Sequence, residues 1–215
     1  MPTQHIAEIL AGSDVFSGAV PYHLGFLASK AQVFSFKVGH EIFATGDPSE
    51  ALFVVLEGRV RIIRLAEDGQ EIGLGFIDAG SIFGEISMLD GKGRSASAVA
   101  YEKCRLGVIC RSDFFSFLDL EPENSRRLLL ILCGRLRDTI DQVHSIGLKG
   151  VEASVARTLL WLASNYGKVR DDGVLIDIKL GQREVGTFAA TSRESVSKAF
   201  GLWREAGHID RAGNK

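Results

Sequence analysis

The sequence predicts an α+β protein built from an antiparallel β-roll, a long helix and a C-terminal helix-turn-helix. Between Gln32 and Ile109, short apolar or alternating runs recur with turn residues between them, a pattern typical of an antiparallel barrel or roll. From Pro122 to about Gly147, apolar residues alternate three and four positions apart, which indicates one long amphipathic helix. Near the C-terminus two short helical segments are separated by only a couple of residues, so the helices must meet at a steep angle.

The N-terminal part is expected to hold short helical pieces, followed by the strands of the roll. Residues 5–30 read as helical segments that break at Gly12, Gly18 and Gly25. The Asp68-Gly69 pair between two alternating runs is a good signal for a hairpin turn. Strands are expected at Val33–Phe36, Glu41–Ala44, Ala51–Glu57, Arg59–Leu65, Glu71–Ile77, Ala96–Ala100 and Arg105–Ile109.

The long helix carries a narrow apolar seam along one face, and its charged residues lie mainly off that seam. The seam consists of Leu129, Leu132, Leu136, Thr139, Val143 and Ile146. The helix packs either against its own roll or against the same helix of an identical second subunit, as a coiled coil. We favour the dimer because the seam is long and narrow, although periodicity alone does not separate the two arrangements.

The C-terminal part begins after an expected hinge at residues 147–150, Gly-Leu-Lys-Gly. A helix is expected from about Glu152 to Tyr166, then a polar turn at residues 171–173 and a strand at Val174–Ile178. The two steeply crossed helices are expected at Gln182–Ala189 and Ser192–Ala206. The chain is therefore predicted to divide into a roll with N-terminal helices (1–120), a long helix (121–148) and a C-terminal unit that holds the two crossed helices (149–215).

Composition argues against a protein that binds polyanions over its whole surface, and against one with a membrane-spanning helix. The formal charge of the 215-residue chain is only −2, but it is uneven: residues 1–150 hold 15 Lys+Arg against 19 Asp+Glu, and residues 151–215 hold 10 against 8. A basic C-terminal unit on an acidic body permits local contact with nucleic acid. No apolar run reaches the roughly 18 residues of a membrane helix, and the mixed polar N-terminus is no signal peptide.

The three cysteines are too few and too scattered for a disulfide framework or a metal cluster. Cys104 and Cys110 are interpreted as small buried apolar residues. We therefore expect no metal, no membrane partner and a reducing, cytoplasmic location.

The stretch Gly84–Ala96 gathers the groups that a phosphorylated sugar requires. Arg94 can pair with a phosphate and Ser95 can donate to it, with backbone amides near Gly84 aimed the same way. An ionised Glu85 can only accept hydrogen bonds, so it suits ribose hydroxyls. The stretch is read as a single loop between strands. The alternative interpretation is a surface turn with an ordinary ion pair between Glu85 and Arg94.

The predicted helix-turn-helix presents a face suited to DNA. Arg193 and Lys198 suit the O6/N7 edge of guanine, and Glu194 suits the amino group of cytosine. Ser192 and Ser195 suit phosphates at the helix N-terminus. In the alternative interpretation, residues 191–194 spell a capping box whose glutamate bonds the backbone. We favour base reading because the two basic residues flank the glutamate on the same face.

These residues carry a resemblance to a known family. The stretch Gly84–Ala96 closely resembles the phosphate-binding cassette of cyclic-nucleotide-binding domains. From about Phe34 onward the chain is similar to the catabolite activator/FNR family of bacterial transcription regulators. The resemblance implies a cyclic-nucleotide-binding roll, a dimerisation helix and a winged helix-turn-helix. The implied nucleotide-binding residues are Gly84, Glu85, Ile86, Arg94, Ser95, Arg135 and Thr139, and the implied DNA-binding residues are Ser192, Arg193, Glu194, Ser195 and Lys198.

Within this set the resemblance gives each residue a role. Glu85 binds the ribose hydroxyl, Arg94 and Ser95 bind the cyclic phosphate, and Arg135 on the long helix neighbours Glu85. In cyclic-AMP receptors of the family, a Thr-Ser pair on the long helix contacts the base, one residue from each subunit. The matching positions are Thr139 and Ile140, and isoleucine can neither donate nor accept a hydrogen bond. We therefore favour cyclic AMP as the effector and keep cyclic GMP as the alternative.

Two further departures concern DNA binding. The cyclic-AMP receptor carries arginine where this chain has Lys198, and a lysine makes a less directional contact with guanine. The family normally continues into a last wing strand beyond the position of Lys215, so the wing is expected to be incomplete.

Three functions from different classes are compared. The leading one is a homodimeric regulator that binds palindromic double-stranded DNA in response to the nucleotide and works with RNA polymerase. The second is a ligand-independent regulator that keeps the cassette as a relic, which Ile140 alone favours. The third is an enzyme that uses Glu85 and Arg94 to cleave a phosphate ester. We reject the enzyme because no second carboxylate or histidine near the cassette can bind a metal or activate water.

Overall fold

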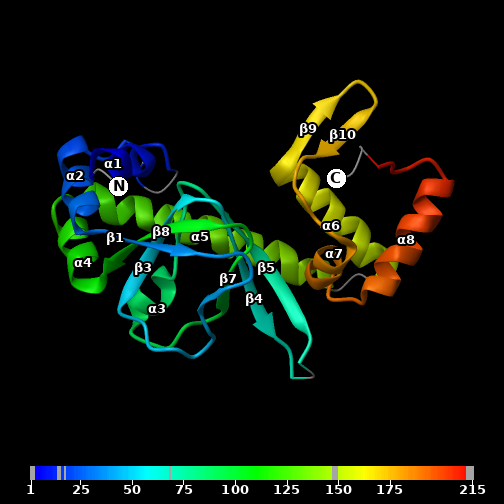
Figure 1. Cartoon of the computed structure of the whole chain (residues 1–215), viewed down its shortest axis with the longest axis horizontal. Helices are drawn as coiled ribbons and strands as arrows, with labels where there is room; N and C mark the ends of the chain where they lie inside the picture. The colour runs from blue at the N-terminus through cyan, green and yellow to red at the C-terminus, as the bar shows by residue number, and fades with distance from the viewer. Residues whose placement is uncertain (1–2, 14–15, 17, 68, 147–149, 212–215) are drawn as a thin grey trace. The chain divides into compact units, whose positions relative to one another are not determined.

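The computed structural model describes residues 3–13, 16, 18–67, 69–146 and 150–211 (Figure 1), with side chains described for all of these except 138 and 141–146. The chain divides into two compact units. The first holds Met1–Arg64 and Leu74–Arg137, and the second holds Leu65–Gly73 and Asp138–Lys215. The predicted hinge at residues 147–149, Asp68 of the predicted hairpin turn and the last residues of the expected wing, 212–215, lie outside the described residues.

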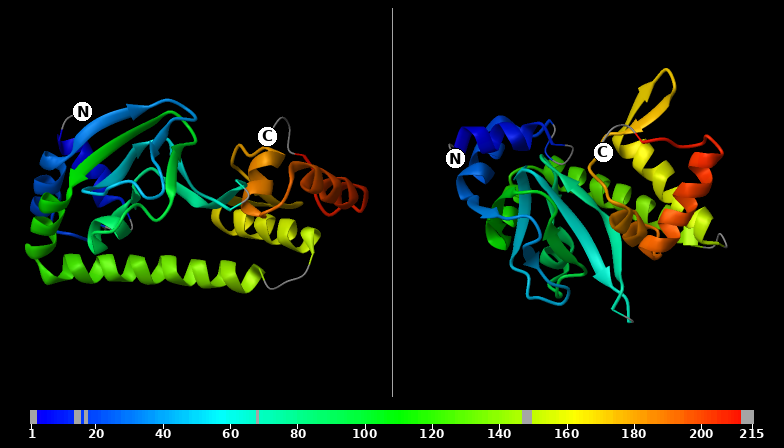
Figure 2. Two further views of the ribbon diagram at one scale, coloured as in Figure 1. Left: turned by 90° about the horizontal axis from the view of Figure 1, so that it is seen from below. Right: turned by 45° about the vertical axis from the view of Figure 1, so that its right-hand side comes forward.

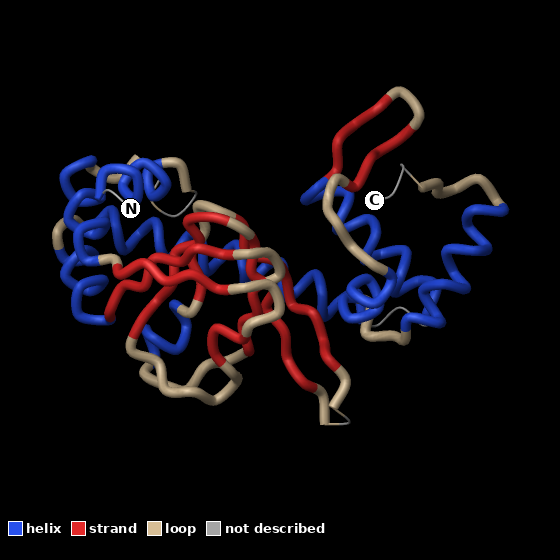
Figure 3. Tube along the Cα trace, in the orientation of Figure 1, coloured by secondary structure: helices blue, strands red, loops and turns tan. Residues whose placement is uncertain are grey.

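The first unit contains most of the antiparallel roll, which confirms the predicted fold class. Among the described residues, two four-stranded sheets form it, in the orders β1-β8-β3-β6 and β2-β7-β4-β5. Figure 3 draws these strands in red and the loops between them in tan. The expected alternation of apolar runs and turns appears at each predicted strand position. The strands are β1 Gln32–Phe36, β2 Glu41–Phe43, β3 Ala51–Glu57, β4 Arg59–Leu65, β5 Glu71–Asp78, β6 Ile82–Phe83, β7 Ser97–Ala100 and β8 Cys104–Cys110.

In the described part of this unit, three short helices and strands were not predicted from the sequence. The two-residue strand β6 and the helices α3 (Glu85–Asp90) and α4 (Arg111–Asp119) are too short to show a periodic pattern. The sequence predicted one continuous loop for the cassette. The structure instead has the short helix α3 followed by a loop. Gly25 was also expected to break a helix, yet it lies inside α2 (Pro21–Lys30), because one glycine costs a helix only about 1 kcal/mol. The other N-terminal helix is α1 (Thr3–Ala11).

Two apolar clusters stabilise this unit. One joins α1, α2, α4 and the start of the long helix to one sheet, with Phe16, Phe114 and Phe117 fully buried. The other fills the space between the strands and includes Phe53 and Phe83.

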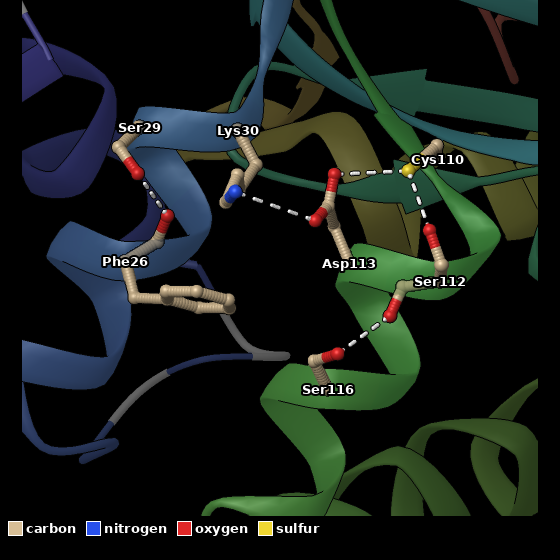
Figure 4. A network of polar contacts seen from close by, with 7 residues as sticks. All are labelled: Phe26, Ser29, Lys30, Cys110, Ser112, Asp113 and Ser116. Atoms are coloured by element: carbon tan, nitrogen blue, oxygen red, sulfur yellow. Dashed lines mark hydrogen bonds and ion pairs between the residues drawn. The ribbon is translucent and has the colours of Figure 1, made fainter.

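The cysteines divide between the interior and the surface. Cys104 is buried as predicted, and burial raises the pKa of its thiol. Cys110 is exposed, contrary to the prediction, because it ends β8 and caps the start of α4. Its thiol donates to Asp113 Oδ2 (2.9 Å), while Lys30 of α2 pairs with the other carboxylate oxygen (3.7 Å; Figure 4). The contact between Lys30 and Asp113 thus links α2 to α4.

The predicted long helix is α5, Pro122–Ile146, drawn as one continuous helix in Figure 2. One face packs on the first unit through the buried Asn124 and Leu128. Leu132, a member of the predicted seam, is half-buried against the same apolar cluster. Leu132 therefore agrees with the own-roll arrangement that the sequence left open, and the pairing of the seam with a second copy stays a prediction.

The second unit contains α6 (Val151–Tyr166), α7 (Gln182–Phe188) and α8 (Arg193–Glu205), close to their predicted bounds. The predicted strand at 174–178 is β10 (Gly173–Ile176), and it pairs with β9 (Gly167–Arg170), which the sequence analysis missed. The three helices share a small core made of Val155, Val185, Ala189, Val196 and Ala199.

Candidate nucleotide site and nucleic-acid interface

The candidate nucleotide site is built around the turn from β6 into α3. Gly84 takes a left-handed conformation (φ +80°) before α3, and Gly91 takes another (φ +72°) after it. A Cβ atom on Gly84 would lie 2.5 Å from Arg94 Nη1. Glycine is therefore required at this position both by the backbone conformation and by the approach of Arg94.

Arg94 is buried beneath this turn, with only 5% of its surface exposed. Its Nη1 donates to the carbonyl oxygen of Gly84 (2.8 Å) and to Ser87 Oγ (3.3 Å), and its Nη2 donates to the carbonyl oxygen of Ala51 (2.8 Å). Burial lowers the pKa of the guanidinium below its usual value, against the opposing effects of Glu85 and Asp47. An arginine still remains charged at physiological pH, so the site holds a buried cation.

Glu85 is buried as well, at 1% exposure, and Arg135 of α5 pairs with it as the resemblance implied. Arg135 donates to Glu85 Oε1 and to the carbonyl oxygen of Ile82. The resemblance thus implied a contact between residues 50 positions apart, and the structure contains it. This ion pair ties α5 directly to the first turn of α3.

Two buried polar atoms of the site have no hydrogen-bond partner among the described residues. They are Oε2 of Glu85, an acceptor, and Nε of Arg94, a donor. Leaving a buried charged group unsatisfied is costly, by more than about 1–3 kcal/mol for each hydrogen bond missing. A ligand that offers both a hydroxyl donor and an anionic acceptor would satisfy the two atoms together.

A second loop, between β2 and β3, supports the cassette and was missed in the sequence analysis. The Gly46 amide donates to the Arg94 carbonyl (2.8 Å), and the Arg94 amide donates to the Asp47 carbonyl (2.9 Å). Thr45 N donates to Ser97 Oγ (2.9 Å). The two loops touch so closely that a Cβ atom on Gly93 would lie 2.7 Å from the Gly46 carbonyl oxygen. Backbone contacts of this kind leave no recognisable motif.

The remaining predicted nucleotide residues lie on the surface. Ser95 follows Arg94 and is exposed, and Ile86 on α3 is 47% exposed. Thr139 and Ile140 are exposed on the part of α5 that belongs to the second unit. Their contact with a base stays a prediction.

An exposed apolar stripe runs along α5 from Leu129 to Ile140. Leu129 and Leu136, two members of the predicted seam, are 61% and 60% exposed, and Ile140 is 56% exposed. Cys133 is exposed between them, so the spacings along the stripe are four, three and four. This is the spacing by which one helix covers another.

The turn between α7 and α8 has the tight geometry of a helix-turn-helix. A Cβ atom on Gly186 would lie 2.8 Å from the Thr191 carbonyl oxygen, so α7 and the turn are in close contact. Ala190 takes the left-handed conformation (φ +48°) that reverses the chain. Val185 and Val196 are buried between the helices.

Ser192 caps α8, and its hydroxyl accepts from the Ser195 amide (3.2 Å). The capping box considered from the sequence is therefore wrong by one position, because Ser192 and not Thr191 is the cap. Hydrogen bonds from its own amide and from the Ser192 hydroxyl lower the pKa of the exposed Glu194 carboxyl. Glu194 is thus ionised and near the helix N-terminus.

The outer face of α8 carries the predicted DNA-binding residues. Arg193, Glu194, Ser197 and Lys198 are exposed, and Ser195 is half-buried as part of the cap. Two cations and one carboxylate at the start of a helix are suited to base edges in a major groove.

Comparison with known proteins now decides the family. A family model of the cyclic nucleotide-binding domain matches residues 33–121, and one of the Crp-like helix-turn-helix domain matches residues 153–215. The chain belongs to the CRP/FNR family. It is a CRP-like, cyclic nucleotide-binding transcription regulator, and this family consists of DNA-binding regulators, not enzymes.

CRP-family relatives cover nearly the whole chain. A CRP-like cAMP-activated global transcriptional regulator of Mycobacterium tuberculosis is 33% identical over 94% of this chain and 90% of its own length. The cyclic AMP receptor protein of Thermus thermophilus is 32% identical over 93% and 89%. The crystal structure of the Thermus thermophilus catabolite activator protein superposes with a TM-score of 0.59, at 30% identity over 93% and 91%.

Two absences hold within the described part of this CRP-family chain. No helix there is both long enough and apolar enough to cross a membrane. No group of three or more His, Cys, Asp or Glu residues there is placed to hold a metal ion.

Proposed function

We propose that this protein is a homodimeric transcription regulator whose binding to palindromic DNA is controlled by cyclic AMP. The observation that carries the proposal is the pair of unpartnered buried atoms, Glu85 Oε2 and Arg94 Nε. A ribose hydroxyl donates to the first and a cyclic phosphate accepts from the second. Ser95, exposed beside Arg94, adds a donor to the phosphate, and Gly84 and Ile86 line the turn.

Cyclic AMP is preferred to other cyclic nucleotides because two relatives that match nearly the whole chain are named for it. Thr139 supplies one polar contact to the base. Ile140 supplies none, so the protein is expected to distinguish adenine from guanine less sharply than a receptor with two polar residues there. Cyclic GMP is the alternative effector.

The dimer is supported by the exposed stripe on α5. Leu129, Leu136 and Ile140 are each more than half exposed, and a second copy of α5 would cover them. A two-fold dimer presents two α8 helices to two half-sites about one DNA turn apart. The binding partners are therefore double-stranded DNA and a second copy of the chain, with RNA polymerase as a further partner in the cytoplasm.

The coupling between nucleotide and DNA passes through α5 in this proposal. Arg135 pairs with Glu85, so a nucleotide hydroxyl at Glu85 would change the contacts of α5. Two sites, two states and a coupling free energy are what allostery requires. A ligand-independent regulator would show the same DNA affinity with and without nucleotide.

The first prediction tests the cassette. Arg94→Ala is expected to weaken cyclic AMP binding about 10- to 100-fold, since the charge-assisted hydrogen bond from Nε to the phosphate is lost at about 1.5–3 kcal/mol. Isothermal titration calorimetry measures the affinity. Arg105→Ala is the matched control, because Arg105 pairs with Glu57 on the surface of the same roll and should leave binding unchanged. Equal affinity of the wild type and Arg94→Ala for cyclic AMP would contradict nucleotide binding by the cassette.

A further inference from the structure

The guanidinium of Arg94 lies over the ring of Phe43. Its Cζ is 4.2 Å from the ring centroid, and a second ring, that of Phe53, lies at 5.4 Å. Phe43 is on β2 and Phe53 is on β3, so the two rings come from different sheets of the roll. A guanidinium within about 6 Å of an aromatic centroid is attracted to the ring face.

Phe43 is itself held by a cluster of rings. Its centroid is 5.5 Å from that of Phe53 and 5.8 Å from that of Phe83, and these two rings stack on each other at 5.0 Å. Phe53 and Phe83 are also directly paired across β3 and β6, and both are buried. The Phe43 ring beside Arg94 is therefore packed against two buried rings, which restrict its movement.

The ring restrains Arg94 without using any of its hydrogen-bond donors. Protein acceptors occupy the Nη1 and Nη2 side of the group, at Gly84, Ser87 and Ala51. A phenylalanine ring has no oxygen or nitrogen acceptor, so Phe43 attracts the Arg94 guanidinium without taking a conventional hydrogen bond from its N–H groups. Nε is left buried and without an acceptor. A cation held in place with its Nε donor unused is preorganised for an anion, which lowers the entropic cost of binding.

We propose that Phe43 is a positioning residue for the phosphate of the bound nucleotide. Its ring holds the Arg94 guanidinium so that Nε stays available to a phosphate oxygen. The inference rests on the proposed function, because it assigns Phe43 a role in the same nucleotide site.

The test begins with Phe43→Leu, which keeps an apolar side chain and removes the ring face. The affinity for cyclic AMP, measured by calorimetry, is expected to fall about 2- to 30-fold. Phe43→Tyr keeps the ring face and is expected to retain wild-type affinity. Phe36→Leu is the matched control, since Phe36 is likewise half-buried against the same apolar cluster but lies on β1, at the edge of the other sheet.

A double-mutant cycle separates positioning from general packing. If Phe43 acts through Arg94, adding Phe43→Leu to Arg94→Ala lowers the affinity no further. If Phe43 only supports the fold, the two losses multiply. Multiplied losses, or wild-type affinity in Phe43→Leu, overturn the positioning role.

A measurement without ligand addresses the contact itself. In ¹⁵N-edited NMR of the free protein, the Arg94 Nε–H resonance should carry a ring-current shift that Phe43→Leu removes and Phe36→Leu preserves. An unchanged resonance in Phe43→Leu overturns the contact. A wild-type protein that binds no cyclic nucleotide overturns the proposed function and this inference with it, whereas binding unimpaired in Phe43→Leu overturns this inference alone.

Discussion

Gly84 shows how strongly single residues constrain the site. The left-handed backbone there costs an L-residue roughly 1–2 kcal/mol, and its Cβ would collide with Arg94. Gly84→Ala is therefore expected to weaken cyclic AMP binding more than tenfold and to lower the melting temperature. Calorimetry and thermal melting measure the two effects.

The control for this substitution is Gly39→Ala. Gly39 has nearly the same φ, +79°, but a Cβ atom there meets nothing within 4 Å. It should lower the melting temperature by the backbone strain alone and leave nucleotide affinity intact. Equal nucleotide affinities in the two variants would show that the approach of Arg94 to Gly84 is irrelevant to binding.

At this scale the sequence could identify charged residues but not their supports. Glu85 and Arg94 were predicted because a carboxylate and a guanidinium in a glycine-rich stretch have a chemical meaning. Phe43, Gly46 and the Ala51 carbonyl lie 40 or more positions before Arg94, and apolar rings and backbone groups look the same wherever they occur. Only the folded chain shows that they contact Arg94.

At the scale of elements, α5 has two apolar faces with different surroundings. Its inner face packs on the roll and its outer stripe is exposed. Leu136→Glu is expected to shift the protein from dimer to monomer, since burial of each leucine contributes about 1.5–3 kcal/mol and a carboxylate would replace it. Sedimentation velocity across a concentration series measures the change.

Leu130→Glu is the matched control for the stripe. Leu130 is 57% exposed, close to the value for Leu136, but it lies on the adjacent face of α5. It should leave the dimer intact. A dimer that survives Leu136→Glu, or dissociates equally with Leu130→Glu, would contradict pairing along this stripe.

In the proposed function, α8 is the helix that contacts DNA bases. Arg193→Ala is expected to reduce affinity for DNA selected from a random library in the presence of cyclic AMP by about 1–3 kcal/mol, with nucleotide affinity unchanged. Fluorescence anisotropy measures the loss. Arg204→Ala is the control, because Arg204 lies in the last turn of α8 and donates to the Phe200 carbonyl. Undiminished DNA affinity in Arg193→Ala would show that α8 does not read bases through its N-terminal half.

Element length decided which parts of the fold the sequence could predict. α5 spans 25 residues and most strands alternate over several residues, so their periods are visible. β6, α3 and the four-residue β9 are shorter than one reliable period. Periodicity shows that α5 has apolar residues, but it does not say which of them pack on the roll, as Leu132 does, and which stay exposed, as Leu136 does.

At the scale of the whole molecule, the chain joins an acidic part, residues 1–150, with the proposed nucleotide site to a basic part, residues 151–215, with the proposed DNA-binding helix. Each unit has its own apolar core, and α5 contributes to both units. The central claim is that the first unit binds a cyclic nucleotide in the cassette. Family membership supports the class of ligand, and the unpartnered atoms of Glu85 and Arg94 support the place.

Thermal melting of the full chain with cyclic AMP, cyclic GMP and 5′-AMP tests this claim most directly. A ligand at 100 times its dissociation constant stabilises the folded protein by about 2.7 kcal/mol, which raises the melting temperature by several degrees. The account predicts the largest rise with cyclic AMP, a smaller one with cyclic GMP, almost none with 5′-AMP, and none in Arg94→Ala. No rise with either cyclic nucleotide, or the same rise in Arg94→Ala as in the wild type, would contradict it.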